Sequence, residues 1–151
     1  MGNREEHLAL AREAIKKHCG EIKSVSSIYE TAAWGKTDQP RFLNQVLQLE
    51  TRLTPRQLLN RLLKIEEQIG RKRNEKYGPR IIDIDILFFN HQVYDSPSLK
   101  IPHPEIQNRR FVLTPMVEIA PGLVHPVLKK TMTDLLSATT DHLEVSIFLS
   151  A

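Results

Sequence analysis

The sequence predicts an α+β protein in which helices pack on a mostly antiparallel sheet. The order of the predicted elements indicates this class, because a helix, two strands, a second helix, a third strand and a last strand follow one another along the chain. The composition, with 40% hydrophobic and 26% charged residues, is that of an ordinary globular protein. A length of 151 residues without repeats or linkers predicts a single domain over residues 1–151.

The first predicted elements are a helix and two strands. Asn3 and Glu6 form a capping-box pattern at the start of a helix over residues 3–19, and Gly20 follows where a C′ glycine belongs. The apolar side of this helix consists of Leu8, Ala11, Ile15 and Cys19. Residues 21–30 and 41–51 have strand-like composition, while Gly, Asp and Pro between them predict a loop over 31–40.

Local signals define the second helix most clearly. Thr54 caps this helix, Pro55 takes its first position, and Gln57 completes a Thr-x-x-Gln box. The predicted end of the helix is Gly70. Its apolar stripe comprises Leu58, Leu59, Leu62, Leu63, Ile65 and Ile69.

The second half of the chain is predicted to contain short elements. A strand over residues 81–89 is followed by a hairpin-like turn with a short second strand over 90–99. Short helices are expected over residues 111–119 and 133–138. Residues 144–150 form the last predicted strand.

Two carboxylates interrupt the apolar run of the strand over 81–89. Side chains alternate between the faces of a strand, so Asp83 and Asp85 share one face. The opposite face carries Ile82, Ile84 and Ile86. Same-face neighbours lie roughly 6.5–7 Å apart, so the two carboxylates could bind one divalent cation or bridge two. Pairing with surface Lys or Arg on a solvated face is the alternative interpretation of the Asp-x-Asp pattern alone.

A basic segment precedes this strand. Residues 71–80 contain five basic side chains and one acidic side chain, and Gly78-Pro79 form the turn that leads into the carboxylates. Guanidinium groups match the geometry of phosphate oxygens, and Mg²⁺ prefers one or two carboxylates together with substrate phosphates. The combination favours phosphoryl transfer, although the chain has neither a Walker loop nor a kinase glycine-rich loop.

The string GRKRNEKYGPRIIDIDILFF, residues 70–89, resembles the signature of the 6-hydroxymethyl-7,8-dihydropterin pyrophosphokinase family. The resemblance also covers SSIYETAAWGKTDQPRFLNQVLQLET, LLNRLLKIEEQIGR and IPHPEIQNRRFVLTPMVEIAP, so that it extends from residue 3 to the early 130s. It implies a ferredoxin-like fold. It also implies transfer of the β,γ-diphosphoryl group from ATP, the co-substrate, to the hydroxymethyl group of a reduced pterin, with release of AMP.

The resemblance implies roles for residues in several segments. Asp83 and Asp85 would hold two Mg²⁺ ions, and Arg71 and Arg80 would join them as catalytic residues that stabilise the transferring phosphates. The ATP-binding positions would be Glu66, Arg71, Arg73, Tyr77, Arg80, Ile86, Lys100, His103 and Arg109. The pterin positions would be Thr31, Ala32, Ala33, Trp34, Phe42, Asn44, Asp83 and Phe111. By residue type alone, Phe42 and Phe111 are more typical of a core.

The start of the chain departs from the family pattern, which begins with an apolar strand and a Gly-Ser-Asn-type turn. Met1-Gly2-Asn3-Arg4 resembles the end of that turn, so we expect the first strand to be missing from this chain. In a ferredoxin-like sheet this strand is interior. Its loss would open two rows of backbone hydrogen-bonding groups.

Other classes of function also fit part of the sequence. A net charge of +3 and a pI near 9.1 are compatible with a small ferredoxin-like nucleic-acid-binding domain that uses residues 71–80. Asp83 and Asp85 argue against this alternative, because without a metal they would repel a nucleic acid backbone. A metal-dependent nuclease would need further carboxylates and a general base, for which Glu66 is the other candidate.

Bulk properties set the expected location and partners. No apolar run approaches the roughly 20 residues of a membrane span, and the polar start is unlike a signal peptide. A single cysteine, Cys19, fits a reducing compartment. We therefore expect a cytoplasmic monomer that binds ATP and a reduced pterin, and neither nucleic acid nor a membrane.

Overall fold

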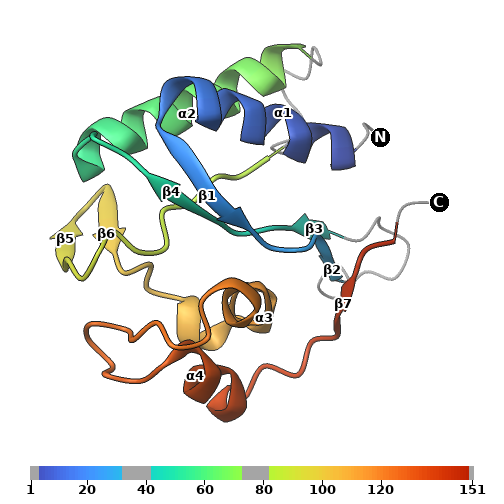
Figure 1. The fold of residues 1–151 in the computed structure, drawn as a ribbon, viewed down its shortest axis with the longest axis vertical. Coiled ribbons are helices and arrows are strands. Elements are labelled where there is room, and N and C mark those ends of the chain that lie inside the picture. Colours follow the sequence, from blue (N-terminus) through green and yellow to red (C-terminus); the bar gives the residue numbers. More distant parts are fainter. Residues whose placement is uncertain (1–3, 32–41, 73–81, 150–151) are drawn as a thin grey trace. The chain divides into compact units, whose positions relative to one another are not determined.

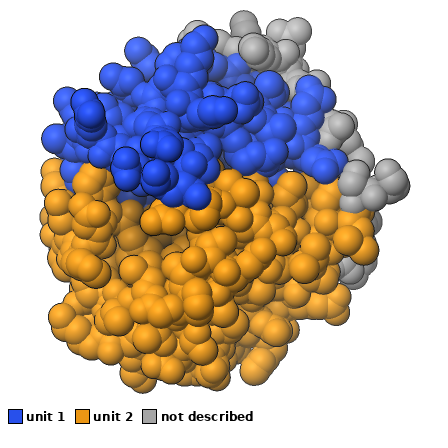
Figure 2. Space-filling model, viewed as in Figure 1, with its two compact units in different colours: residues 1–23, 49–86 blue, residues 24–48, 87–151 orange. Residues whose placement is uncertain are grey.

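Residues 4–31, 42–72 and 82–149 are described in the computed structural model of the chain (Figure 1). Helices and antiparallel strand pairs both occur, which confirms the predicted α+β class. The chain divides into unit 1, residues 1–23 and 49–86, and unit 2, residues 24–48 and 87–151 (Figure 2). Among the described residues, no helix combines the length and the apolar character that a membrane span requires.

Unit 1 is built on two helices that lie side by side, α1 (Arg4–His18) and α2 (Pro55–Lys72) (Figure 1). Burial of each large apolar side chain stabilises such a pair by about 1.5–3 kcal/mol. Leu63, which was predicted to belong to the apolar stripe, is instead 49% exposed. The buried apolar side chains are Ala11, Ile15 and Cys19 from α1 and its C-terminal end, and Leu58, Leu62, Ile65 and Ile69 from α2.

The ends of α2 test two local predictions. The backbone N–H of Thr54 donates to Gln57 Oε1 at 3.0 Å, and the N–H of Gln57 donates to Thr54 Oγ1 at 3.2 Å, which confirms the capping box. The prediction that Gly70 ends the helix is wrong, because α2 continues to Lys72. One glycine in a helix costs only about 0.5–1 kcal/mol, less than the packing of the stripe contributes. The predicted cap of α1, Asn3, lies outside the described residues.

The two strands predicted before residue 52 are each divided, contrary to expectation. The first becomes β1 (Glu21–Val25) and β2 (Tyr29–Thr31), and the second becomes β3 (Phe42–Asn44) and β4 (Leu47–Glu50). The breaks face each other: the N–H of Ser26 donates to Val46 O at 2.9 Å, and Ser26 Oγ accepts the N–H of Val46 at 3.0 Å. Because a side chain replaces a backbone partner there, the regular ladder stops. β1 then pairs with β4, while β2 pairs with β3.

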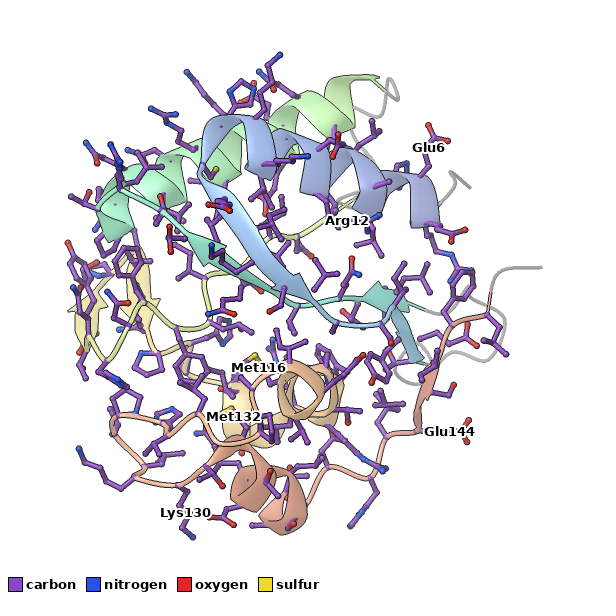
Figure 3. All side chains as sticks on the ribbon, viewed as in Figure 1. Glu6, Arg12, Met116, Lys130, Met132 and Glu144 are labelled. Carbon is purple, nitrogen blue, oxygen red and sulfur yellow. The ribbon has the colours of Figure 1, made fainter. Side chains whose placement is uncertain are left out.

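Unit 2 combines a three-stranded sheet with helices. The strand order is β3-β2-β7, with β7 at Val145–Ile147. A hairpin forms later than predicted, between β5 (Tyr94–Ser96) and β6 (Leu99–Ile101), and not between residues 82–89 and a second strand. The 3₁₀ helix η1 (Ile106–Asn108) and the helices α3 (Arg110–Ile119) and α4 (Met132–Ala138) follow, and both α-helices lie where they were predicted. Their core contains Ile106, Leu113, Met116, Met132 and Leu135, and Figure 3 labels Met116 and Met132 beside α3.

The segment with the two carboxylates differs from its prediction. Residues 82–89 form no strand in the described part of the chain, although a strand was expected over 81–89. Exposure still alternates at the start of the segment, where Asp83 and Asp85 are exposed and Ile82, Ile84 and Ile86 are half-buried. The alternation therefore survives without a hydrogen-bonded ladder.

Asp141 supplies the cap that α3 lacks in its own sequence. The residue before the helix, Arg109, makes no side-chain cap. Asp141 Oδ2 instead accepts the N–H of Arg110 at 2.8 Å, and Asp141 Oδ1 accepts the N–H of Leu143 at 3.0 Å. We predict that Asp141→Ala lowers the free energy of unfolding by about 1–2 kcal/mol, as loss of a capping side chain does.

Urea unfolding followed by circular dichroism measures this effect of Asp141. A matched control is Glu144→Ala in the same segment, since Glu144 is exposed and extends away from the ribbon (Figure 3). Its free energy of unfolding should stay within about 0.5 kcal/mol of the wild type. Equal midpoints for Asp141→Ala and Glu144→Ala would contradict the capping role.

Candidate functional site

Glu66 holds the backbone between the two aspartates of unit 1. It lies on α2, half-buried, and its Oε2 accepts the backbone N–H of Ile84 at 2.6 Å. Ile84 stands between Asp83 and Asp85, so this bond fixes the stretch of chain from which both carboxylates extend. Glu66 was predicted to contact the nucleotide, and in the structure it accepts a hydrogen bond from this backbone N–H.

The carboxylate pair is the acidic feature from which a cation site could be built. Among the described residues, no group of three or more His, Cys, Asp or Glu side chains is arranged to hold a metal ion. Within the described residues, therefore, no third His, Cys, Asp or Glu side chain completes a metal site with Asp83 and Asp85. A pair of hard oxygen donors of this kind suits Mg²⁺, which keeps several waters or takes phosphate oxygens from a substrate.

Two predicted nucleotide positions lie on or beside the β5–β6 hairpin of unit 2. Lys100 is opposite Asp95 in the register, and its Nζ lies 2.6 Å from Asp95 Oδ1. His103 follows the cis peptide between Ile101 and Pro102. His103 Nδ1 accepts the N–H of Glu105 at 3.1 Å, which orients the ring. A neutral imidazole in this arrangement carries its proton on Nε2.

The start of α3 brings a cation next to an aromatic ring. Arg109 precedes the helix, and Phe111 is its second residue. The guanidinium carbon of Arg109 lies 5.8 Å from the centre of the Phe111 ring, within the range of a cation–π contact. Both side chains are half-buried, so this contact fixes their relative position beside solvent.

The sheet of unit 2 brings three predicted pterin positions together. Thr31 on β2 is opposite Phe42 on β3, and Tyr29 is opposite Asn44 in the same antiparallel register. Thr31 is buried at 2% exposure, whereas the side chain of Phe42 is 55% exposed. A large aromatic ring left open on a sheet is the kind of surface on which a flat heterocycle stacks. The core role suggested by residue type alone is therefore wrong for Phe42.

The predicted site residues fall into three groups. Those in unit 1 are Glu66, Asp83, Asp85 and Ile86. Those in unit 2 are Thr31, Phe42, Asn44, Lys100, His103, Arg109 and Phe111. Outside the described residues lie Ala32, Ala33, Trp34, Arg73, Tyr77 and Arg80, and the same holds for the side chain of Arg71 at the end of α2.

Sequence reasoning missed Glu118, which links α3 to the start of β2. Its Oε1 accepts the N–H of Ser27 at 2.9 Å and the hydroxyl of Tyr29 at 2.8 Å, and its Oε2 accepts the Ser27 hydroxyl at 2.8 Å. Desolvation opposes ionisation of this carboxyl, but the hydrogen bonds outweigh it and hold the pKa of Glu118 below its ordinary value. No local pattern relates Glu118 to partners 89 and 91 residues away, so the sequence offered no signal for the link.

Burial is the main cause that raises the pKa of Tyr29 to about 12, and the hydrogen bond to Glu118 and the charge of that carboxylate act in the same direction. Tyr29 is therefore a neutral donor at ordinary pH. Glu118, whose pKa is lowered, is the charged acceptor. The contact pairs a protonated phenol with an ionised carboxylate, which is the stronger kind of hydrogen bond.

The described residues form a mixed helix-and-strand fold with two exposed aspartates in unit 1 and an exposed aromatic ring in unit 2. Comparison with known proteins gives the family. The model of the family "7,8-dihydro-6-hydroxymethylpterin-pyrophosphokinase (HPPK)" matches residues 1–121. This chain belongs to that family.

Three relatives illustrate the similarity. The 2-amino-4-hydroxy-6-hydroxymethyldihydropteridine pyrophosphokinase of Aquifex aeolicus is 40% identical over 134 residues, which cover 89% of this chain and 83% of the relative. The Bacillus subtilis protein of the same name is 41% identical over 120 residues, or 79% of this chain and 72% of the relative. The folic acid synthesis protein fol1 of Schizosaccharomyces pombe is 39% identical over 137 residues, 90% of this chain but 19% of that protein.

Proposed function

We propose that this chain transfers the β,γ-diphosphoryl group of ATP to the hydroxymethyl group of 6-hydroxymethyl-7,8-dihydropterin, giving AMP and the pterin diphosphate. The chain is thus a diphosphokinase of folate biosynthesis with ATP as co-substrate. Membership of the pyrophosphokinase family over residues 1–121 carries this proposal. The relatives from Aquifex aeolicus and Bacillus subtilis are named as pyrophosphokinases of a hydroxymethyldihydropteridine.

In the proposed reaction the pterin hydroxyl oxygen attacks the β-phosphorus of ATP in line with the bond to the α-phosphate oxygen. A new oxygen–phosphorus bond forms, the bond between the β-phosphorus and its α-bridging oxygen breaks toward AMP, and the hydroxyl proton is released. Phosphoryl transfer of this kind asks the protein mainly for positioning and for charge neutralisation.

Asp83 and Asp85 would hold the magnesium ions, two of them by resemblance to the family. Their carboxylate oxygens are the hard ligands that Mg²⁺ prefers, and both side chains are exposed. When bound, magnesium would offset the negative charge of the phosphates. Glu66 supports the pair indirectly, because it fixes the backbone N–H of Ile84 between them.

The nucleotide side of the proposal combines donors and cations. His103 presents Nε2–H to a phosphate oxygen, since its Nδ1 is occupied by the N–H of Glu105. Arg109, held against the Phe111 ring, adds a fixed positive charge. The assignments of Arg71, Arg73, Tyr77 and Arg80 to the transferring phosphates rest on the resemblance of residues 70–89. Lys100 adds a second positive charge on this side. To bind a phosphate, its ammonium group would have to leave its ion pair with Asp95.

The pterin side needs aromatic faces and an amide that reads the polar edge of the ring. Phe42 offers an exposed aromatic face, and Asn44, two residues further along the same strand, offers the amide. Phe111 supplies a second aromatic ring from α3. Thr31 through Trp34 complete this side of the proposed site by resemblance.

Several finer properties belong to the same proposal. We infer a ferredoxin-like arrangement, one catalytic domain over residues 1–151, and a monomer in the cytoplasm. Cys19 is buried, and burial raises the pKa of its thiol against a smaller opposite effect of Arg61, which fits an unreactive cysteine in a reducing compartment. The comparisons give no support to the alternative of a nucleic-acid-binding domain.

The proposal predicts that purified protein forms AMP only when ATP, the pterin and magnesium are all present. Chelation by EDTA should stop the reaction, and added Mg²⁺ should restore it, because the phosphate charge is otherwise uncompensated. Mass spectrometry should find the pterin heavier by two phosphoryl groups. ADP as the nucleotide product, or AMP without pterin, would contradict the proposed reaction.

A further inference from the structure

We propose that Glu118 is a positioning residue for the pterin side of the site. Its carboxylate holds β2 against α3, and it thereby sets Thr31, Phe42 and Asn44 in place relative to Phe111. The inference deepens the proposed function and rests on it. All the residues concerned belong to unit 2.

The Glu118 carboxylate is held in one orientation by three hydrogen bonds. Both carboxylate oxygens are used, Oε1 by the Ser27 N–H and the Tyr29 hydroxyl and Oε2 by the Ser27 hydroxyl, at 2.8–2.9 Å. Hydrogen bonds to an ionised acceptor are roughly twice as strong as neutral ones. Three donors from two residues on two oxygens leave the start of β2 little freedom to slide or rotate against the helix.

Strand β2 transmits this constraint to the predicted ligand residues. Tyr29 and Thr31 share its buried face, and β2 contacts α3. The same strand pairs Thr31 with Phe42 and Tyr29 with Asn44. Because paired strands are held in register by their ladder, a shift of Tyr29 carries Thr31, Phe42 and Asn44 with it.

Helix α3 supplies the other end of the constraint. Phe111 and Glu118 are seven residues apart, which is nearly two turns and roughly 10 Å along the axis, so they lie on the same side of the helix. Asp141 holds the first turn of this helix at Arg110. One helix therefore carries both the aromatic ring and the carboxylate that anchors the opposing strand.

The chemistry of ring binding explains why such an anchor would matter. Stacking and edge recognition depend on the spacing between Phe111 and the β3 residues. Misplacement of about 1 Å can cost on the order of a hundredfold in rate. Loss of the anchor should therefore weaken pterin binding more than ATP binding.

The test compares Glu118→Ala, Glu118→Gln and Tyr29→Phe with the wild type in steady-state assays of AMP formation. Glu118→Ala should raise the KM for the pterin by about tenfold while the KM for ATP changes by less than about twofold. Glu118→Gln keeps one acceptor oxygen and should recover part of the loss. Glu13→Ala is the matched control, because Glu13 is an exposed helical glutamate of α1, which carries no predicted pterin residue.

Thermal unfolding of each variant separates positioning from general stability. A purely structural role would lower the melting temperature and leave both KM values at wild-type levels in the folded protein, and that result would overturn the inference. Equal rises in the KM for ATP and for the pterin would also overturn it. If Glu118→Ala does not fold, Tyr29→Phe is the deciding variant. It removes one of the three donors to Glu118 and should still raise the KM for the pterin without raising the KM for ATP. Absence of AMP from the wild type would instead refute the proposed function.

Discussion

Replacing Asp83 with alanine is expected to lower kcat/KM for AMP formation on the order of a thousandfold, the scale seen when a group that stabilises developing charge is removed. The physical reason is the loss of one of the two carboxylates proposed to hold magnesium beside the ATP phosphates. The fold should persist, because Asp83 is exposed and exposed substitutions usually change stability by less than about 0.5 kcal/mol. Turnover and thermal unfolding measured on the same preparation check both parts.

Asp134→Ala provides the control for this experiment. Asp134 is exposed in the first turn of α4 and has no predicted role in the site. Its removal should leave turnover within about twofold of the wild type. Asp83→Ala with wild-type turnover at low magnesium would remove Asp83 from the metal site, and a loss of fold in that variant would assign it a structural role instead.

Replacing Gly20 with alanine is expected to have the largest effect on stability. A Cβ at Gly20 would lie 2.1 Å from the carbonyl oxygen of Glu50 and 3.1 Å from Thr51 Cα, and both are backbone atoms that cannot rotate away. The positive φ of 156° adds strain for any L side chain. Because the chain must shift to accept one extra methyl group, we expect a loss of about 3 kcal/mol. The melting temperature should fall by about 6–12 °C.

Gly70→Ala is the matched control for Gly20→Ala in the same unit. Gly70 lies within α2, and a Cβ there would meet nothing within 4 Å. Alanine should stabilise this helix by about 0.5–1 kcal/mol, since it lowers the entropy of the unfolded chain without strain. A melting temperature for Gly20→Ala at or above the wild-type value would contradict the close approach of the end of β4 to Gly20.

Local signals predicted the helices well, and their physical basis explains why. The capping box of Thr54 and Gln57 involves residues three apart, and the buried positions of α2 recur at helical spacing. Both patterns are local, so they can be predicted from the sequence without knowledge of the fold. The exposure of Asp83 and Asp85 opposite half-buried isoleucines also followed from alternation alone.

Long-range contacts determined what could not be predicted. The two early strands break at Ser26 and Val46, because hydrogen bonds between residues 20 positions apart replace the ladder. Residues 82–89 form no strand, and the backbone N–H of Ile84 donates to the side chain of Glu66 on α2 instead. Phe42 has a core-like residue type, yet it stands open on the sheet. Glu118 acts on partners about 90 residues away.

The most direct test of the proposed reaction is a single turnover with ATP labelled at the β-phosphorus, with pterin and magnesium present. Attack at the β-phosphorus requires that all the label of the consumed ATP appear in the pterin product, together with unlabelled AMP. Label that remains in ADP would mean transfer of a single phosphoryl group. Label in free pyrophosphate would mean hydrolysis, and either result would contradict diphosphoryl transfer by this chain.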